Sequence, residues 1–392
     1  MDAIVLGLGV NGLAVVRSLG EKSLRVAGIY HDKNNELGIH SRYLKKIEKI
    51  SVSYTKDELL TACLKLVETK EPAQKKAVIF CTSDSFAATI SKHQSLFEQH
   101  FIITTPDKDM YWHFVAKQPT ADICTTNNFP IPKTIYCTEK YQLLIKAQHL
   151  TYPLIIKPNL TFGDEFPGKN LIVHTKDELG KFISDYPQLE TEVVVQEIVP
   201  SGDGKIYLVT TYSDKAGKVR IAYSGKKIRQ YLPDYGVTCF GVSESNKHLK
   251  QITIQFLEAI NYTGYATLEF AYDEKNKRFY FIELNIRSFY HNQLFKDASL
   301  DINYLAYQLE AQTSINSEQC LMLQKDGIFW LDFTRDFGSF LRKKHLTTLT
   351  WLKSLLKARS FAYFDKKDIK PFIVSLKVFT IIVLKNLFQN NR

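Results

Sequence analysis

Two neighbouring segments restrict the fold of this chain more than any other feature of its sequence. Residues 265–273 (YATLEFAYD) and 278–287 (RFYFIELNIR) are rich in aromatic and β-branched residues, and the polar residues 274–277 (EKNK) between them are typical of a turn. They predict an antiparallel β-hairpin. In the last part of the second segment, every second residue is polar: Glu283, Asn285 and Arg287. A strand that is otherwise buried would present these three side chains on one face, and that polar face needs a function.

The hairpin brings two acidic side chains together. A turn centred on Asn276 places Glu269 directly opposite Glu283, and side-chain alternation puts Asn285 and Arg287 on the face of Glu283. Like charges directly across an antiparallel pair are destabilising, so a cation should lie between them. Two carboxylates and a carboxamide oxygen suit Mg²⁺. The alternative is a surface hairpin whose glutamates are neutralised by nearby arginines and lysines.

The N-terminal part of the chain predicts a different architecture. Residues 2–6, 25–30 and 77–84 are short β-branched runs, and residues 12–19 have a helical pattern between the first two. This alternation indicates a parallel sheet in a doubly wound α/β domain.

A glycine-rich turn follows the first predicted strand. Gly7, Gly9 and Gly12 match the G-x-G-x-x-G pattern, and Asp32 lies near the end of the second strand. This arrangement is typical of dinucleotide binding, so an NAD-dependent oxidoreductase is one hypothesis. The other is that these glycines only permit close packing of strand against helix.

A second unit begins near Trp112 and contains mostly short strands. A glycine-containing loop at 160–169 separates the first two, and a helix is predicted at 247–260. Its composition predicts an α+β region. The strands expected before the hairpin cover residues 152–159, 170–175, 192–199, 205–213 and 219–225.

Charge is distributed unevenly along the 392 residues. From Leu341 onward the chain carries 12 Lys or Arg and 2 Asp or Glu, which accounts for the whole net charge of +10. A nucleic-acid partner would have to be held by this tail alone, so none is expected. The acidic N-terminus lacks the basic region of a secretory signal, and the six cysteines show no metal-type spacing, which favours a cytoplasmic protein with structural thiols.

From Met1 to about residue 325 the sequence resembles the ATP-grasp superfamily, in which two lobes hold ATP between them. The pattern E…E-x-N-x-R of that family stands here as Glu269, Glu283, Asn285 and Arg287. The resemblance implies ATP and Mg²⁺ (or Mn²⁺) as cofactors, with the first three residues as metal ligands. It also implies that loop 160–169 covers the phosphates. The nucleotide-binding residues that it suggests are Lys117, Lys157, Gln196, Glu197, Ile198 and Asp203.

Within the superfamily, the sequence is most similar to carboxylate–amine ligases of the D-aspartate ligase type. The Val-Glu-His run of biotin carboxylases is replaced after Arg287 by SFYHNQLF, which disfavours a biotin-dependent carboxylase. The resemblance implies that an acyl phosphate forms and an amine displaces phosphate. We expect Arg287 to be catalytic, and Lys227 and Arg229 to hold a carboxylate or phosphate. A solvated basic strand edge is the alternative for the last two.

The resemblance implies three domains: a Rossmann-like domain (1–112), a two-lobed ATP-grasp domain (113–325) and a basic helical C-terminal extension (326–392). The glycine turn then lines a substrate cleft without binding NAD. A non-catalytic nucleotide-binding protein is the third hypothesis, which the intact metal pattern disfavours. The expected partners are small carboxylate and amine substrates, among them a cell-envelope precursor, and a homodimer is compatible with the sequence.

The C-terminal segment 371–389 (PFIVSLKVFTIIVLKNLFQ) is strongly apolar. Lys377 and Lys385 interrupt it, so it lacks the ~20 consecutive apolar residues of a transmembrane helix. We expect it to pack on the rest of the protein or on a second subunit. Peripheral attachment to the inner face of a membrane through the basic tail is the alternative.

Overall fold

The structure is a computed structural model of the whole chain. Side chains of 382–389 are not described. The residues that the structure describes are 1–67, 75–139, 142–159, 166, 170–186, 192–231, 236–311, 321, 323–342 and 346–389.

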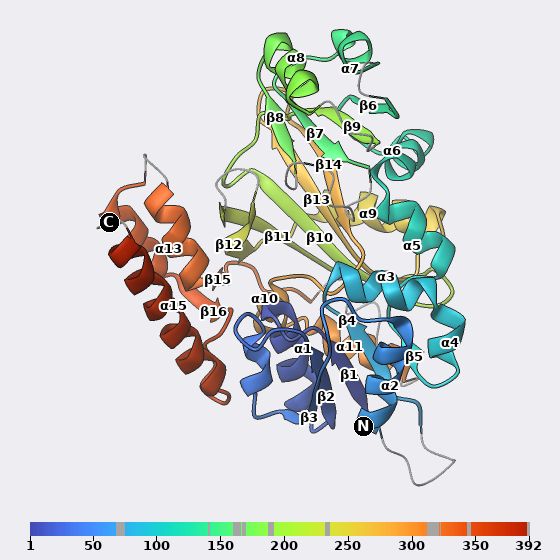
Figure 1. The fold of residues 1–392 in the computed structure, drawn as a ribbon, viewed down its shortest axis with the longest axis vertical. Helices are drawn as coiled ribbons and strands as arrows, with labels where there is room; N and C mark the ends of the chain where they lie inside the picture. The colour runs from blue at the N-terminus through green and yellow to red at the C-terminus, as the bar shows by residue number, and fades with distance from the viewer. Residues whose placement is uncertain are drawn as a thin grey trace.

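The first domain contains a five-stranded parallel sheet in the order β3-β2-β1-β4-β5 (Figure 1). Alternate residues of β1 enter different hydrophobic clusters, so both faces of this sheet are buried, as parallel sheets require. The predicted doubly wound domain is confirmed. Its elements are β1 (Ala3–Leu6), α1 (Val10–Gly20), β2 (Val26–Tyr30), η1 (Leu37–His40), β3 (Leu44–Lys49), α2 (Lys56–Val67), β4 (Val78–Cys81), α3 (Asp84–Lys92), α4 (Gln94–Glu98) and β5 (Ile102–Ile103).

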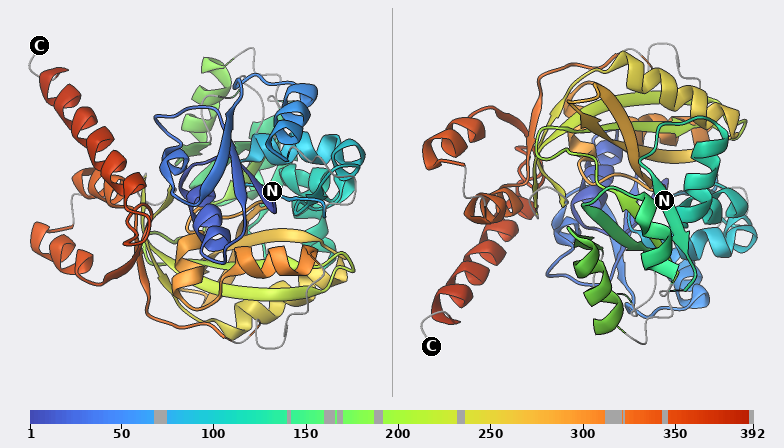
Figure 2. Two further views of the ribbon diagram at one scale, coloured as in Figure 1. Left: turned by 90° about the horizontal axis from the view of Figure 1, so that it is seen from below. Right: turned by 90° about the horizontal axis from the view of Figure 1, so that it is seen from above.

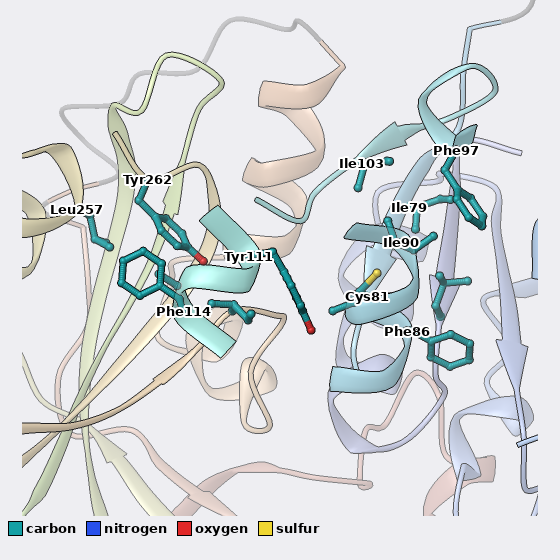
Figure 3. Close-up of a cluster of buried hydrophobic side chains, with 14 of the residues drawn as sticks. Ile79, Cys81, Phe86, Ile90, Phe97, Ile103, Tyr111, Phe114, Leu257 and Tyr262 are labelled. Carbon is teal, nitrogen blue, oxygen red and sulfur yellow. The ribbon is translucent and has the colours of Figure 1, made fainter. Parts of the chain in front are cut away.

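Helices α5 (Lys108–Val115) and α6 (Lys117–Thr126) follow this domain. In Figure 3, Tyr111 and Phe114 of α5 lie between side chains of the first domain, such as Cys81, and Tyr262 near the end of α9. Tyr111 and Tyr262 are fully buried. One continuous hydrophobic cluster therefore joins the first domain to the rest of the molecule.

A four-stranded sheet with the order β6-β9-β7-β8 forms a small lobe with its own core. Helix α8 covers it and is capped at its start, because the Thr175 hydroxyl accepts from the Glu178 amide at 3.1 Å and the Glu178 carboxylate accepts from the amide of His174, one residue before the cap, at 2.7 Å. The elements are β6 (Thr134–Cys137), α7 (Gln142–Lys146), η2 (Ala147–His149), β7 (Leu154–Pro158), β8 (Leu171–Val173), α8 (Lys176–Asp185) and β9 (Val193–Glu197).

The largest sheet has seven strands in the order β14-β13-β10-β11-β12-β15-β16. It lies between the small lobe and the first domain in Figure 1. Its antiparallel part contains the predicted hairpin, and β11 continues six residues beyond its predicted end at residue 225. The elements up to residue 311 are β10 (Ile206–Ser213), β11 (Val219–Tyr231), β12 (Val237–Ser243), α9 (Lys247–Ala259), β13 (Gly264–Asp273), β14 (Arg278–Asn285), α10 (Asn292–Asp297) and α11 (Ile302–Glu310).

The C-terminal extension differs from the helical tail predicted after residue 325. It contributes β15 (Phe329–Leu331) and β16 (Ala358–Phe361) to the large sheet, in addition to α13 (Phe333–Arg342), α14 (Thr348–Leu355) and α15 (Lys370–Gln389). Strand β15 pairs with β12 and buries Trp330 completely, which explains why this short apolar run is a strand. The helices project from one side of the molecule (Figure 2). Among the described residues, no helix is long and apolar enough to cross a membrane.

Candidate active site

The predicted hairpin is formed by β13 and β14, and Glu269 lies directly opposite Glu283. At the turn, Asp273 pairs with Arg278, a register that would place Ile282 opposite Glu269. A one-residue bulge at Ile282 restores the pairing of the two glutamates. The predicted pair is therefore confirmed, although the turn is not centred where the sequence suggested.

The two faces of β14 have different surroundings. Phe281, Leu284 and Ile286 pack in the hydrophobic cluster that contains the core of the first domain. Because strand side chains alternate, Glu283 and Asn285 face the opposite side, as predicted. The bulge thus gives the end of this strand one apolar face and one polar face.

A lysine lies beside the glutamate pair. The Lys227 ammonium on β11 is 2.5 Å from the Glu269 carboxylate, and both side chains are only 6% exposed. Glu269 lies opposite Leu208, which lies opposite Gly225, and Lys227 shares their face two residues further along β11. The cation that the opposing glutamates require is thus supplied by a strand two places away in the sheet.

Arg287 connects the end of the hairpin to the first domain. Its guanidinium forms a two-point ion pair with Asp84 at the start of α3, with distances of 2.7 and 3.2 Å. Burial lowers the pKa of Arg287, but the charge and hydrogen bonds of Asp84, together with the charge of Glu283, raise it by more, so Arg287 stays fully charged. The Asn11 amide donates to the backbone carbonyls of Thr82 and Ser288. The strand ends of β1 and β4 therefore adjoin the polar face of β14.

The glycine turn is filled by the protein itself. Gly7 has a φ of +92°, and a Cβ at Gly12 would lie 2.0 Å from the Gly7 carbonyl oxygen, so both positions require glycine. The Glu36 carboxylate accepts from the amides of Leu8 at 2.5 Å and His31 at 2.7 Å. An internal carboxylate thus occupies one amide of the glycine turn, that of Leu8, together with an amide that follows β2. This geometry favours the packing interpretation of the glycines over NAD binding.

The predicted nucleotide residues lie mainly on the small lobe. The Lys157 ammonium on β7 is 3.4 Å from the Gln196 side-chain oxygen on β9, which places these two candidates together. The Lys117 amide donates to the backbone carbonyl of Asn159 at 3.1 Å, next to the end of β7. Lys157 is thus part of β7, and the backbone of Lys117 is bonded to the residue directly after that strand. Loop 160–169, apart from Phe166, lies outside the described residues.

The segment predicted to contact adenine is held tightly by the protein. The amide of Glu197 donates to Lys133 and that of Ile198 to Pro153, with distances of 3.0 and 3.1 Å. These two amides are used internally, so any contact with a base must come from other backbone atoms of the segment. Asp203 lies near β11, where it accepts from Gln230 at 3.5 Å.

Arg229 pairs with an acidic residue of the C-terminal extension and not with the glutamate pair. Its guanidinium forms two hydrogen bonds with Asp336 of α13, at 2.7 and 2.9 Å, and lies 4.2 Å from the Phe240 ring centroid. Asp336 is fully buried and also accepts from the Trp351 indole at 2.8 Å. Arg229 therefore attaches the C-terminal helices to β11. Its charge is thus paired with Asp336, and its expected role in holding a substrate carboxylate or phosphate stays a prediction.

The sequence prediction missed His291, which is 1% exposed and packs against Phe289 and Trp330. Burial, and secondarily the charge of Lys227, lowers the pKa of His291 to about 3, so the imidazole is neutral. Asn11 and Asp84 were missed too. Asn11 lies in the glycine turn after the first predicted strand and Asp84 is the last residue of the third, so both stand at the carboxyl ends of predicted parallel strands, and this position was the available signal.

The donor set at the glutamate pair fits Mg²⁺. No group of three or more His, Cys, Asp or Glu gathers as metal ligands within the described part of the chain, so an all-protein cage is not expected there. Two opposed carboxylates with the amide of Asn285 nearby instead match a site that is completed by substrate phosphates. Lys227 shows that a positive charge is accommodated at Glu269.

Comparison with known sequences agrees with this geometry. Residues 242–311 match the family described as the carbamoyl-phosphate synthase L chain, ATP binding domain, and this stretch includes the whole E…E-x-N-x-R pattern. A D-aspartate ligase from Enterococcus faecium (strain Aus0004) is 23% identical over 299 residues, which cover 72% of this chain and 70% of the ligase. The resemblance inferred from the sequence is thereby confirmed.

Solved structures with the same fold include two carboxylases. The biotin carboxylase of Campylobacter jejuni, in a complex with β,γ-ATP, matches 84% of this chain and 74% of its own with a TM-score of 0.67 at 16% identity. The biotin carboxylase domain of Hydrogenobacter thermophilus 2-oxoglutarate carboxylase, a dimer in complex with MgADP and bicarbonate, covers 84% and 73% with a TM-score of 0.66 at 14% identity. At these identities the likeness establishes the fold, and both structures contain adenine nucleotide.

Proposed function

We propose that this chain, which has the ATP-grasp fold and resembles D-aspartate ligase, is an ATP-dependent carboxylate–amine ligase. It would join a carboxylate to an amine through an acyl phosphate and release ADP and phosphate. The observation that carries this proposal is the opposed pair Glu269 and Glu283, with Lys227 at its edge and Arg287 at the end of the same strand. This combination is typical of phosphoryl transfer, in which positioning and charge stabilisation dominate.

The nucleotide would lie between the small lobe and the large sheet. We assign Lys117 and Lys157 to the phosphates, and the segment containing Gln196, Glu197 and Ile198 to the base. Asp203, near β11, is the candidate for the ribose. Lys157 lies on β7 and Lys117 is bonded through its backbone directly after that strand, so both would neutralise a polyphosphate from the side of this lobe.

Glu269, Glu283 and Asn285 would hold Mg²⁺ or Mn²⁺. A divalent ion there would neutralise phosphate charge and orient the transferred group. The protein's own contribution is to keep two carboxylates opposite each other, although they repel each other in the absence of a cation. Lys227 balances one of them until the ion and nucleotide bind.

Arg287 and Lys227 would act on the transferring phosphoryl group. Arg287 is fixed by the Asp84 carboxylate, which orients its planar guanidinium without removing its charge. Lys227 has a flexible stem, so its ammonium can leave Glu269 for a substrate oxygen when a metal ion takes its place. One fixed and one movable cation would stabilise the developing negative charge.

The acceptor would bind where the first domain meets β14. The order of the parallel sheet reverses between β1 and β4, and ligands of such sheets bind at that point, beyond the carboxyl ends of the strands. Asn11, Thr82 and Ser288 meet there. Because the sequence relative is a D-aspartate ligase, we propose an amino-acid carboxylate as donor and an amine of a cell-envelope precursor as acceptor.

The experiment is ADP release from Mg²⁺-ATP with a panel of amino acids and amines. Glu283→Gln removes a charge with little change in volume and should abolish turnover, whereas Glu274→Gln in the hairpin turn, where the side chain is 64% exposed, should not. Native turnover by Glu283→Gln would refute the metal assignment. Thermal stabilisation by ATP and not by NAD⁺ would exclude the oxidoreductase, and binding of ATP without turnover of any substrate would favour a non-catalytic protein.

A further inference from the structure

Exposed apolar side chains gather on the C-terminal helices. Of sixteen large hydrophobic residues that are strongly exposed in the described part of the chain, nine lie from Phe333 onward. The segment from Phe333 to the C-terminus is less than a sixth of the sequence. The concentration is too high for the scattered exposed apolar residues of an ordinary surface, and such patches mark interaction sites.

Helix α14 presents one apolar stripe to solvent. Leu349, Leu352 and Leu356 are 63%, 48% and 76% exposed, and their spacing places them on one face. Trp351 on the opposite face is buried and stacks on Phe340 of α13 at 4.6 Å. The helix is therefore attached through one side while three leucines face water on the other.

Helix α15 has the same organisation. Its inner face packs on α13, where Phe379 contacts Phe333 and Phe337 at ring distances of 5.9 and 5.6 Å. Ile373 and Leu376 on another face are 45% and 40% exposed. The expected packing of this helix on the protein is thus present, but it uses only part of the apolar surface.

Lysines border both stripes. Lys353 lies beside the leucines on α14 and Lys357 in the turn just after that helix, while Lys370 and Lys377 lie beside Ile373 and Leu376 on α15; all four are exposed. Helices with an apolar face bordered by lysines are typical of proteins that lie in the plane of a membrane surface.

The helices are fixed relative to the body. Asp368, just before α15, is buried and accepts from Arg17 of α1 at 3.0 Å and from Ser41 at 2.7 Å. Arg229 and Asp336 attach α13 in the same way. Because Trp351 attaches α14 to α13, each of the two stripes lies on a helix that is held by its other side.

Charge discriminates among the partners of this surface. From Leu341 onward there are 12 basic and 2 acidic residues, and one of the two acids, Asp368, is buried against Arg17. A symmetric contact with a second copy would set this basic surface against itself. Nucleic acid would match the charge, but bases stack on aromatic side chains and gain little from exposed Leu and Ile. An anionic lipid surface matches both the charge and the aliphatic stripes.

We propose that α14 and α15 bind the surface of a membrane that contains anionic phospholipids. The leucine and isoleucine stripes enter the interface, and the lysines contact the headgroups. The inference goes beyond the ligase function and does not depend on it. For a ligase, the consequence is that a lipid-linked acceptor would meet the enzyme at the surface where it is anchored.

The test is flotation of the full-length protein with vesicles. We expect it to float with vesicles of phosphatidylserine and phosphatidylcholine at 0.1 M salt and to stay at the bottom with phosphatidylcholine alone. Raising the salt to about 0.5 M should weaken binding because exposed charges are screened. Absence of flotation with the anionic vesicles at low salt overturns the proposal.

Two pairs of variants locate the contact. Leu349→Ser/Leu352→Ser/Leu356→Ser should lower the partition coefficient at least tenfold. Val52→Ser/Ile145→Ser, at 78% and 66% exposure in other parts of the molecule, should not change it. Unchanged binding of the leucine variant overturns the proposal.

The charge variant keeps the test valid if the leucine variant does not fold. Lys353→Gln/Lys370→Gln/Lys377→Gln should weaken binding about 100-fold, since each basic residue near an anionic surface contributes about 1 kcal/mol. The matched control removes three exposed lysines elsewhere, Lys33, Lys108 and Lys181. Equal losses in both variants would mean non-specific attraction and overturn the assignment to α14 and α15. Sedimentation of the wild type as a dimer and of the leucine variant as a monomer would identify a second copy as the occupant instead.

Discussion

Lys227→Met tests the central feature of the site, because it removes the positive charge beside Glu269 and keeps the apolar stem. Both side chains of the pair are 6% exposed and their charged atoms are 2.5 Å apart. Removing one partner of such a buried pair costs about 3–5 kcal/mol, because the remaining charge is left in a poorly solvated place. Here Glu283 lies directly opposite and adds repulsion. We expect a loss in this range in EDTA.

Mg²⁺ should reverse much of this loss if the two glutamates bind it. A ligand present at 100 times its Kd stabilises by about 2.7 kcal/mol. The wild type should gain less, since the ion must first displace the Lys227 ammonium from Glu269. Stability should therefore depend on Mg²⁺ more strongly in the variant than in the wild type.

The assay is guanidinium unfolding followed by circular dichroism, with and without Mg²⁺. The control is Lys226→Met on the same strand, whose ammonium lies 4.8 Å from the Tyr207 ring and does not contact the glutamates. Lys226→Met should lose about 1 kcal/mol at most and gain nothing extra from Mg²⁺. Equal midpoints for Lys227→Met and the wild type in EDTA, or equal responses to Mg²⁺, would refute the reasoning.

Three further predictions concern other parts of the structure. His291→Leu should make the protein less sensitive to acid. Between pH 7 and 5 the wild-type imidazole, with a pKa of about 3, takes up no proton in the folded state but does so in the unfolded state, so the variant should avoid about 2 kcal/mol of the destabilisation measured by urea unfolding at the two pH values. An unchanged pH dependence would contradict the buried neutral state. Gly12→Ala should lower the free energy of unfolding by about 1–3 kcal/mol, because its Cβ would overlap the Gly7 carbonyl. Gly180→Ala on α8, with open space around it, should be neutral or stabilising in the same urea unfolding measurements. A neutral Gly12→Ala would contradict the packing argument. Lys250→Met should stabilise the folded protein by up to about 3 kcal/mol at pH 7, because burial lowers the pKa of the Lys250 ammonium to about 8. This gain should shrink as the pH rises from 8 to 10, and a loss of stability at pH 7 would show that the charge is better solvated than its burial suggests.

The sequence by itself determined the local structure and the position of the glutamates. Period-2 and helical patterns are local properties, so β1, α1, β2, β4, α9 and the hairpin appear close to their predicted limits. The hairpin and the facing glutamates were predicted too, but their pairing depends on a bulge at Ile282 that the sequence pattern did not show. The resemblance to the ATP-grasp superfamily also rests on that short pattern.

The tertiary structure alone decided which residues from distant parts of the chain meet at these positions. Lys227 and Arg229 are two residues apart, yet one pairs with Glu269 and the other with Asp336, more than 100 residues later. Glu36 accepts from the Leu8 amide in the glycine turn that the sequence presented as a dinucleotide site, and Asp84 forms an ion pair with Arg287, which lies about 200 residues later in the chain. Charge partners of this kind depend on sheet order and domain packing, for which a linear pattern holds no signal. The same holds for the tail. Strand β15 is buried by pairing with β12, and the inner faces of α14 and α15 are buried against α13, so the apolar stripes that stay exposed mark a surface without a partner among the described residues.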